Sequence, residues 1–319
     1  MRIYLTGATG RLGGAVFAKL PQAIPIVRKS SESKAKMKNE IVSDFSVESL
    51  TKIFKDADVV IHLAGSVDTL NPANLREVNV ELTDRIVAST PSKSKIIFAS
   101  SISVYGKRLA ELPANEETKT NPDSDYSRSK YEAEQIVQKH QNHVILRIGT
   151  VYGSQFKEYF KIFEMIEKGK MKLIGDGSNH IPFVHVDDVA DAICAVADIG
   201  IGGSAKSGTY VVAGEALTQK KIIGFAAKSL EIDKTIKQTK NDKYDFGSVS
   251  FSFALFATGI RELLSKFGGK RPTLTTEHIL VLGSDRVFDC KKAKKELGFS
   301  PRSIAQGITE LVTIYKKSV

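Results

Sequence analysis

The sequence has no tryptophan and only two cysteines, Cys194 and Cys290, among its 319 residues. Two cysteines cannot build the framework of several disulfides that holds small secreted domains together. No cluster of cysteine and histidine has the spacing of a zinc site, so we expect no metal. These absences favour a reducing compartment, and we expect a cytoplasmic protein.

Long apolar runs are missing as well. The longest largely apolar stretch, residues 251–260, is too short to span a bilayer, so we expect no stable membrane insertion. Residues 1–7 (MRIYLTG) resemble a strand, and we expect no signal peptide. The hydrophobic fraction of 42% is typical of a soluble globular protein.

Positive charge is in excess, because 46 lysines and arginines against 36 acidic residues give a net charge of +10. Such an excess suits an anionic ligand, a nucleic acid or a membrane surface, but also a generic lysine-rich surface. The lysine-rich stretch at 34–38 has no interleaved aromatic residues, and no recognised RNA-binding motif is present. We therefore expect a small-molecule substrate and no nucleic-acid partner.

Short apolar strands alternate with helical stretches along the first half of the chain. This alternation predicts an α/β fold, a doubly wound parallel sheet of the Rossmann type, with ligands at the C-terminal ends of the strands. The strands are expected at residues 2–5, 23–30, 40–45, 57–65, 94–100 and 143–153, and a helix is expected at 74–90.

A glycine-rich turn, TGATGRLGG, follows the first strand directly and leads into an apolar helix. Its glycines, Gly7, Gly10 and Gly13, allow a tight turn and a close approach of the backbone to a phosphate. The helix N-terminus favours anions. The spacing G-x-x-G-x-x-G differs from the G-x-G-x-x-G fingerprint, yet the strand–turn–helix context indicates nucleotide binding.

The second strand ends in Arg28 and Lys29, with no carboxylate before Glu32. An acidic residue at this place binds the ribose 2′-OH of NAD, whereas an arginine accommodates the 2′-phosphate of NADP. The sequence therefore predicts NADP as the preferred cofactor and leaves NAD possible. Arg11 in the glycine turn is expected to contribute to the same pocket.

Tyr126 and Lys130 stand four residues apart at the start of an expected helix, so both side chains project from one face. A phenol has an ordinary pKa of about 10, and a fixed ammonium beside it favours the phenolate and lowers that pKa. The pair would then be a poised proton donor and acceptor. A half-buried tyrosine beside a solvated lysine would show the same spacing.

Nine segments, in order and over nearly the whole chain, resemble the extended short-chain dehydrogenase/reductases, the NAD-dependent epimerase/dehydratase family. The family holds nucleotide-sugar epimerases and dehydratases, and also dihydroflavonol-reductase-like and 3β-hydroxysteroid-dehydrogenase-like enzymes. The matching segments lie at 6–13, 43–45, 62–65, 79–83, 100–106, 126–130, 146–153, 175–193 and 288–303.

The resemblance implies a role for each matching residue. Tyr126 would be the catalytic acid/base, Lys130 would lower its pKa and bind the nicotinamide ribose, and Ser101 would hydrogen-bond the reacting oxygen. Substrate contacts are expected at Ser103, Thr150 and His180, although a lone histidine is more often structural. The expected cofactor contacts are Gly7, Thr9, Gly10, Arg11, Leu12, Gly13, Arg28, Lys29, Asp44, Phe45, Leu63, Ala64, Gly65 and Asn79, together with Tyr126 and Lys130.

The resemblance also implies hydride transfer between a nicotinamide and a ketone or secondary alcohol. It implies a nucleotide-binding domain at 1–152 and 181–214 and a smaller, mostly C-terminal substrate-binding domain at 153–180 and 215–319. A homodimer through the helices around the Tyr126–Lys130 segment is expected.

The branch of the family is less defined. Nucleotide-sugar epimerases carry an asparagine and two arginines where this chain has Thr150, Ile181 and Leu280. A diphosphate would lack charged partners there, which favours an oxidoreductase of the dihydroflavonol-reductase-like or hydroxysteroid-dehydrogenase-like branch. The alternatives are a nucleotide-sugar epimerase or dehydratase with tightly bound NAD, and a non-catalytic nucleotide-binding scaffold.

The apolar stretch that begins at residue 251 agrees with that branch. Phe251, Phe253, Leu255 and Phe256 are expected either to line an apolar substrate cleft or a lid, or to belong to the core. Lys270 and Arg271, which follow it, remain candidate partners for a diphosphate.

Overall fold

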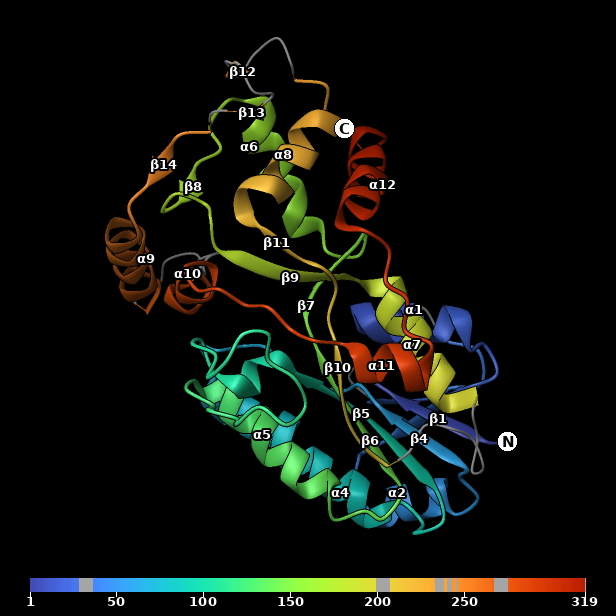
Figure 1. The fold of residues 1–319 in the computed structure, drawn as a ribbon. Helices are drawn as coiled ribbons and strands as arrows, with labels where there is room; N and C mark the ends of the chain where they lie inside the picture. The colour runs from blue at the N-terminus through green and yellow to red at the C-terminus, as the bar shows by residue number, and fades with distance from the viewer. Residues whose placement is uncertain are drawn as a thin grey trace.

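The computed structural model describes residues 1–28, 37–198, 207–232, 238–239, 243–244, 246–266 and 275–318. The chain forms a larger part around a central sheet and a smaller part that stands on one edge of it (Figure 1). Lys29, Lys270 and Arg271 lie outside the described residues.

The central sheet has seven strands in the order β10-β6-β5-β4-β1-β2-β3, and every neighbouring pair is parallel. The predicted doubly wound parallel sheet is therefore confirmed. Its inner strands are buried on both faces, which explains why their sequences are continuous apolar runs. The strands are β1 (Ile3–Thr6), β2 (Ile24–Arg28), β3 (Ile41–Ser43), β4 (Val59–His62), β5 (Lys95–Ser101), β6 (His143–Ile148) and β10 (Gly208–Val212).

Helices cover both faces of this sheet (Figure 1). Those of one face pack on the largest core cluster, and those of the other face enclose two smaller clusters. The first group is α1 (Arg11–Lys19), α7 (Val186–Asp198) and α11 (Lys291–Leu297), and the second is α2 (Val47–Phe54), α4 (Leu82–Ser89) and α5 (Asp125–Val137).

The helix expected at 74–90 is present but interrupted. It consists of α3 (Pro72–Leu75), a π-helical segment η2 (Arg76–Glu81) and α4. Such π-helical turns often occur at functional sites. Asn79, one of the expected cofactor residues, lies in this segment.

The smaller part has its own core around helices α6 (Phe160–Glu167), α8 (Gln219–Ser229) and α12 (Ile304–Lys316). A three-stranded sheet joins the two parts, with β9 (His180–His185) between β11 (Ala216–Thr218) and β7 (Thr150–Tyr152). The remaining elements are the short turns η3 (Ile102–Tyr105) and η4 (Lys157–Tyr159), strands β8 (Leu173–Ile174), β12 (Gln238–Thr239), β13 (Lys243–Tyr244) and β14 (Ser248–Val249), and helices α9 (Phe251–Lys266) and α10 (Thr276–Leu282).

The predicted domain boundaries stay a prediction, and two elements lie across them. Strand β9 begins one residue before the boundary at 181, and it pairs both with β7 in the predicted nucleotide-binding domain and with β11 in the predicted substrate-binding domain. Helix α11 belongs in sequence to the second predicted domain but packs beside α7 and β10. Within the described part of the chain, each helix is too short or too polar to cross a lipid bilayer.

Candidate active site

The glycine turn packs against the end of β4. Gly7 has a φ of +76°, and a Cβ there would lie 2.5 Å from the backbone N of Ala64. A Cβ on Gly13 would lie 2.0 Å from the backbone O of Gly7. Only glycine fits at these two positions, so the turn and the strand end are held in close contact.

The N-terminus of α1 opens from this turn. Its N-cap residue, Gly10, has no side chain that could accept hydrogen bonds from the first N–H groups of the helix. A cavity of ≈390 Å³ begins at Thr9, Gly10 and Arg11 and continues along α1. Free helical N–H groups beside a side-chain-free turn fit a pyrophosphate, and Leu12 and Gly13 complete the first turn.

The basic residues expected around a 2′-phosphate differ in their surroundings. Arg28 ends β2 on the surface, and its guanidinium lies 5.9 Å from the centroid of the Phe45 ring. Arg11 forms an ion pair with Glu158 and lies 4.3 Å from the Phe156 ring centroid. Of the two, Arg28 is the one without an acidic partner among the described residues.

Asp44 and Phe45 follow β3 next to Arg28. Asp44 is exposed, and its Oδ1 accepts a hydrogen bond of 2.9 Å from the backbone N of Ser46. This backbone hydrogen bond holds the pKa of Asp44 below its ordinary value. Phe45 is buried at a φ of +59°, so the backbone turns sharply here. The two residues form a fixed turn beside the end of β2.

Asn79 connects the loop after β4 to helix α5. Its Oδ1 accepts a hydrogen bond of 2.7 Å from the backbone N of Ser66, and its Nδ2 donates to the Ser66 O at 3.0 Å and to the Ser129 Oγ at 2.9 Å. Asn79 is 1% exposed. It therefore positions the segment Leu63–Gly65 against the helix that carries Tyr126.

The three expected catalytic residues come from β5 and α5. Helix α5 begins at Asp125 after a capping box of Ser124 and Ser127, so Tyr126 and Lys130 share one face near its start. The side chain of Ser101, the last residue of β5, lies close enough to the phenol of Tyr126 to lower its pKa. Lys130 Nζ donates a hydrogen bond of 2.6 Å to the backbone O of Ala99.

The direction of the Tyr126 pKa shift differs from the expectation. Burial raises this pKa, the charge of Glu277 raises it further, and the neighbouring Ser101 side chain opposes both. Lys130 does not lower the pKa of Tyr126 as expected. Its ammonium is hydrogen-bonded to the backbone of β5 and lies 4.2 Å from the Phe98 ring centroid. Burial also lowers the pKa of Lys130, to about 8, against the opposing effect of Glu134.

A buried ion pair lies beneath these residues and was given no role by the sequence analysis. Arg147 Nη2 is 2.7 Å from Glu134 Oε2, and Glu134 Oε1 accepts a hydrogen bond of 2.5 Å from Ser100 Oγ. Arg147 Nη1 also donates to the Tyr105 hydroxyl at 2.9 Å. The pair ties α5, β5 and β6 together. An arginine inside the apolar strand HVILRI was the signal that could have revealed it.

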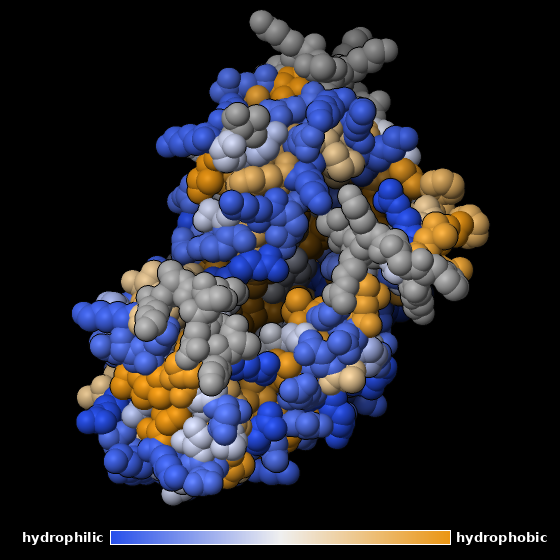
Figure 2. Space-filling view, turned by 180° about the vertical axis from the view of Figure 1, so that it is seen from behind, coloured by the Kyte–Doolittle hydropathy of each residue, from blue (hydrophilic) through white to orange (hydrophobic). Residues whose placement is uncertain are grey.

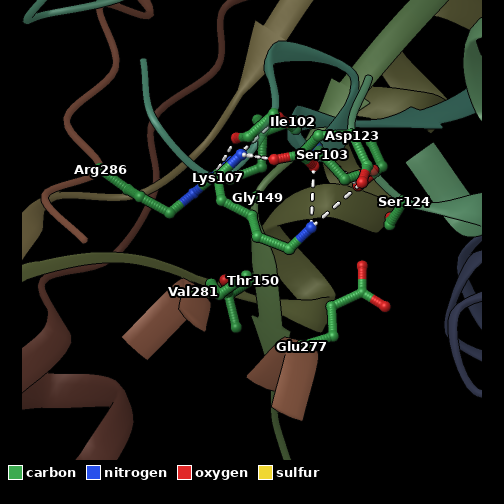
Figure 3. A pocket seen from close by; sticks show the side chains of 12 residues that line it. Ile102, Ser103, Lys107, Asp123, Ser124, Gly149, Thr150, Glu277, Val281 and Arg286 are labelled. Atoms are coloured by element: carbon green, nitrogen blue, oxygen red, sulfur yellow. Dashed lines mark hydrogen bonds and ion pairs between the residues drawn. The ribbon is translucent and has the colours of Figure 1, made fainter. Parts of the chain in front are cut away.

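A cavity of ≈150 Å³ opens at the end of β5 beside Ser101 (Figure 3). Three expected residues, Ser101, Ser103 and Thr150, line it. His180 does not; its Nδ1 lies 2.8 Å from Asp285 Oδ1. The other lining residues are Ile102, Gly106, Lys107, Asp123, Ser124, Gly149, Glu277, Val281 and Arg286.

Charged groups also line this cavity. Four of its side chains, Lys107, Asp123, Glu277 and Arg286, are charged, and the sequence analysis assigned none of them to the site. Glu277 extends from α10 into the cavity (Figure 3). Neither it nor Arg286 belongs to a spaced motif, so no sequence signal pointed to them.

The phenylalanines of α9 are not among the residues that line this cavity. Phe253 is 61% exposed and Phe256 67% exposed, so these two are also not core. Figure 2 shows apolar side chains gathered on the outer edge of the smaller part. Leu280, at a position where epimerases carry an arginine, is half-buried, and Ile181 belongs to the core of the smaller part.

Known proteins resemble this chain along most of its length. It is 28% identical over 268 residues to 3beta-hydroxysteroid-dehydrogenase/decarboxylase isoform 1 of Arabidopsis thaliana, covering 79% of this chain and 60% of the plant protein. It is 22% identical to N-acetyl-alpha-D-glucosaminyl-diphospho-ditrans,octacis-undecaprenol 4-epimerase of Escherichia coli O157:H7, covering 82% and 78%. The chain spans about half the length of several curated relatives that it matches.

Solved structures show the same fold. The UDP-N-acetylglucosamine 4-epimerase of Bacillus cereus superposes with a TM-score of 0.72 at 21% identity, over 99% of both chains. The model of the NAD dependent epimerase/dehydratase family, an enzyme family that binds NAD(P), matches residues 3–213. The glycine turn, the parallel sheet and the Ser101, Tyr126 and Lys130 arrangement lie within those residues. The chain therefore belongs to the NAD dependent epimerase/dehydratase family.

Proposed function

We propose that this protein is an NADP-preferring oxidoreductase that interconverts a ketone and a secondary alcohol on a small organic substrate. One observation carries the proposal: Ser101, whose side chain lies close enough to the phenol of Tyr126 to lower its pKa, lines a cavity at the end of β5. The glycine turn and the N-terminus of α1 would hold the pyrophosphate of the cofactor. When bound, the nicotinamide supplies or accepts the hydride.

The chain's own residues handle the proton. In the reducing direction the carbonyl carbon gains a hydride, and the Tyr126 phenol gives its proton to the carbonyl oxygen. Ser101 hydrogen-bonds the same oxygen while negative charge develops on it. In the oxidising direction the alcohol proton passes to the Tyr126 phenolate. Because burial and Glu277 raise the pKa of Tyr126, its phenol is protonated at neutral pH, which favours reduction.

The preference for NADP rests on Arg28. It ends β2 on the surface next to the turn of Asp44 and Phe45, where a Rossmann fold holds the ribose. A guanidinium at this place complements a 2′-phosphate.

A second candidate is a nucleotide-sugar epimerase with tightly bound NAD. The charged and hydroxylated lining of the cavity favours it, because polar side chains can pair with the hydroxyls of a sugar. The two candidates differ in stoichiometry. A reductase consumes one NADPH per product, whereas an epimerase regenerates its cofactor in each cycle and leaves the NADPH and NADH concentrations unchanged.

The experiment is a substrate panel of ketones, secondary alcohols and UDP- and dTDP-sugars, assayed with NADPH and NADH and by product analysis. Tyr126→Phe should lower kcat about 10²- to 10⁴-fold, the usual contribution of a general acid. Tyr131→Phe, on the same helix, should leave kcat unchanged. Sugar epimerisation without net NADPH consumption would favour the second candidate. Equal turnover by wild type and Tyr126→Phe would instead favour a scaffold without this chemistry.

We also propose a homodimer through the outer faces of α4 and α5. These two helices pack against each other on one face of the sheet (Figure 1). Light scattering during size-exclusion chromatography would give the mass in solution, and a monomer would overturn this proposal.

A further inference from the structure

Arg286 reaches the cavity from the segment between α10 and α11 and is 3% exposed. Its Nη1 donates a hydrogen bond of 2.6 Å to the backbone O of Gly106, and its Nη2 donates one of 2.9 Å to the backbone O of Ile102. The third donor, Nε, is buried and has no hydrogen-bond partner among the described residues. The guanidinium is thus fixed in place while its Nε–H stays unpaired.

Ser103, which lines the same cavity, also has a buried polar atom that is unpaired among the described residues. Its Oγ is buried and has no hydrogen-bond partner in the part of the chain that the structure describes. Buried polar groups in folded proteins are nearly always hydrogen-bonded, because leaving one unpaired costs free energy. Two such groups beside one cavity indicate that their partner is a ligand.

The charges around the cavity show which kind of ligand suits it. Two cationic residues, Lys107 and Arg286, face two anionic residues, Asp123 and Glu277. Lys107 Nζ is 3.0 Å from Asp123 Oδ1, so this pair neutralises itself. Asp123 also acts on the charge of Arg286, and Glu277 adds a second carboxylate to the lining. The lining carries no excess of positive charge for a phosphate and suits a neutral oxygen group instead.

The position of Ser103 fixes where that oxygen lies. Ser101 and Ser103 are two residues apart, with the backbone N of Ser103 donating a hydrogen bond of 3.1 Å to Ser101 Oγ. Both side chains line the cavity. Because Ser101 lies beside the Tyr126 phenol, an oxygen held by Ser103 would lie next to the reacting carbon.

We propose that Arg286 and Ser103 form a subsite that anchors a second, neutral oxygen of the substrate, a hydroxyl or carbonyl adjacent to the reacting carbon. The subsite decides which ketones are turned over, because an analogue without this oxygen leaves Arg286 Nε and Ser103 Oγ unpaired. The turnover readout rests on the proposed reductase function, whereas a binding readout does not.

The test compares two ring ketones that differ in one hydroxyl, 2-hydroxycyclohexanone and cyclohexanone, reduced with NADPH. Wild type should favour the hydroxyketone in kcat/KM by about 10- to 100-fold, the range of a hydrogen bond to a charged group. Binding is measured in parallel by calorimetry with 1,2-cyclohexanediol and cyclohexanol, which needs no turnover.

Two matched pairs of variants separate binding from folding. Ser103→Ala should lose most of the hydroxyl preference and keep or raise the melting temperature, because it removes a buried hydroxyl that has no partner. Ser94→Ala removes a buried hydroxyl that donates at 2.6 Å to the Ala57 O, and should lower the melting temperature without changing the preference. Arg286→Lys should lower the preference, whereas Arg302→Lys, which weakens the ion pairs of Arg302 with Asp188 and Glu310, should not.

Each outcome of these measurements either supports or contradicts the subsite. Equal kcat/KM values for the two ketones in wild type would overturn the subsite and leave the reductase function standing. If wild type reduces neither ketone but binds the diol in a way that depends on Ser103 and Arg286, the reductase function is wrong and the subsite is supported. If wild type neither reduces the ketones nor binds the diol more tightly than cyclohexanol, the subsite is wrong.

Discussion

The ammonium of Lys130 and the backbone oxygen of Ala99 are joined by a hydrogen bond of 2.6 Å. Since Ala99 lies two residues before Ser101 in β5, this bond holds helix α5 against the strand end that carries Ser101. Lys130 is 6% exposed, and burial lowers its pKa to about 8.

The low pKa of Lys130 predicts how stability depends on pH. In the unfolded chain a lysine has a pKa of about 10.4, so between about pH 8 and that value the unfolded state binds more protons than the folded state. The free energy of unfolding due to Lys130 should therefore rise with pH across this window, by up to about 3 kcal/mol. Urea unfolding of wild type and Lys130→Met at several pH values gives this contribution as a difference, in which other titrating groups cancel.

Lys52→Met is the control for that comparison, because Lys52 is exposed and its pair with Glu48 lies on the surface. It should show the same pH dependence as wild type. Parallel curves for wild type and Lys130→Met would contradict the prediction.

Two adjacent glycines in α1 should respond oppositely to alanine. A Cβ at Gly13 would collide with the Gly7 O at 2.0 Å, so Gly13→Ala should destabilise the protein by about 1–3 kcal/mol and weaken NADPH binding. At Gly14 the nearest atom would be the Ala8 O at 3.8 Å, so Gly14→Ala should stabilise the helix by about 0.5–1 kcal/mol. Chemical denaturation and fluorescence titration measure both. Equal effects of the two changes would show that the turn is looser than described.

Removing the charge of Glu277 should lower the pKa of Tyr126, because the carboxylate disfavours the phenolate. The tyrosinate absorbance of Tyr126 is obtained by subtracting the titration curve of Tyr126→Phe. In Glu277→Gln this absorbance should begin to rise at a lower pH. The basic limb of kcat/KM for reduction should move the same way. Glu48→Gln, an exposed carboxylate on α2, is the control and should leave both curves in place. An unshifted curve for Glu277→Gln would place Glu277 too far from Tyr126 to matter.

Reversing the charge of Arg28 should reverse the cofactor preference. Arg28→Asp would repel a 2′-phosphate and could accept a hydrogen bond from a ribose 2′-OH. The ratio of kcat/KM for NADPH to that for NADH should fall by at least about tenfold, which corresponds to about 1.4 kcal/mol. Lys52→Asp introduces the same charge change on an exposed helix and should not alter the ratio. An unchanged ratio in Arg28→Asp would remove the basis for the NADP preference.

The tyrosine–lysine spacing illustrates how far local rules extend. The period of the helix placed Tyr126 and Lys130 on one face, and the structure confirms that helix. The helical period does not predict which residues from other elements surround the Tyr126 phenol. Burial and Glu277, which comes from α10, act on Tyr126 more strongly than the lysine one turn away.

The sequence by itself determined the parallel sheet and the glycine turn, because continuous apolar strands and side-chain-free positions are properties of neighbouring residues. Only the tertiary structure decided the polarity of the cavity. Glu277 and Arg286 lie far along the chain from Ser101 and Tyr126, and packing of the smaller part brings them together. Desolvation and charge depend on distances in space, so the chemistry of this site follows from contacts that no local pattern encodes.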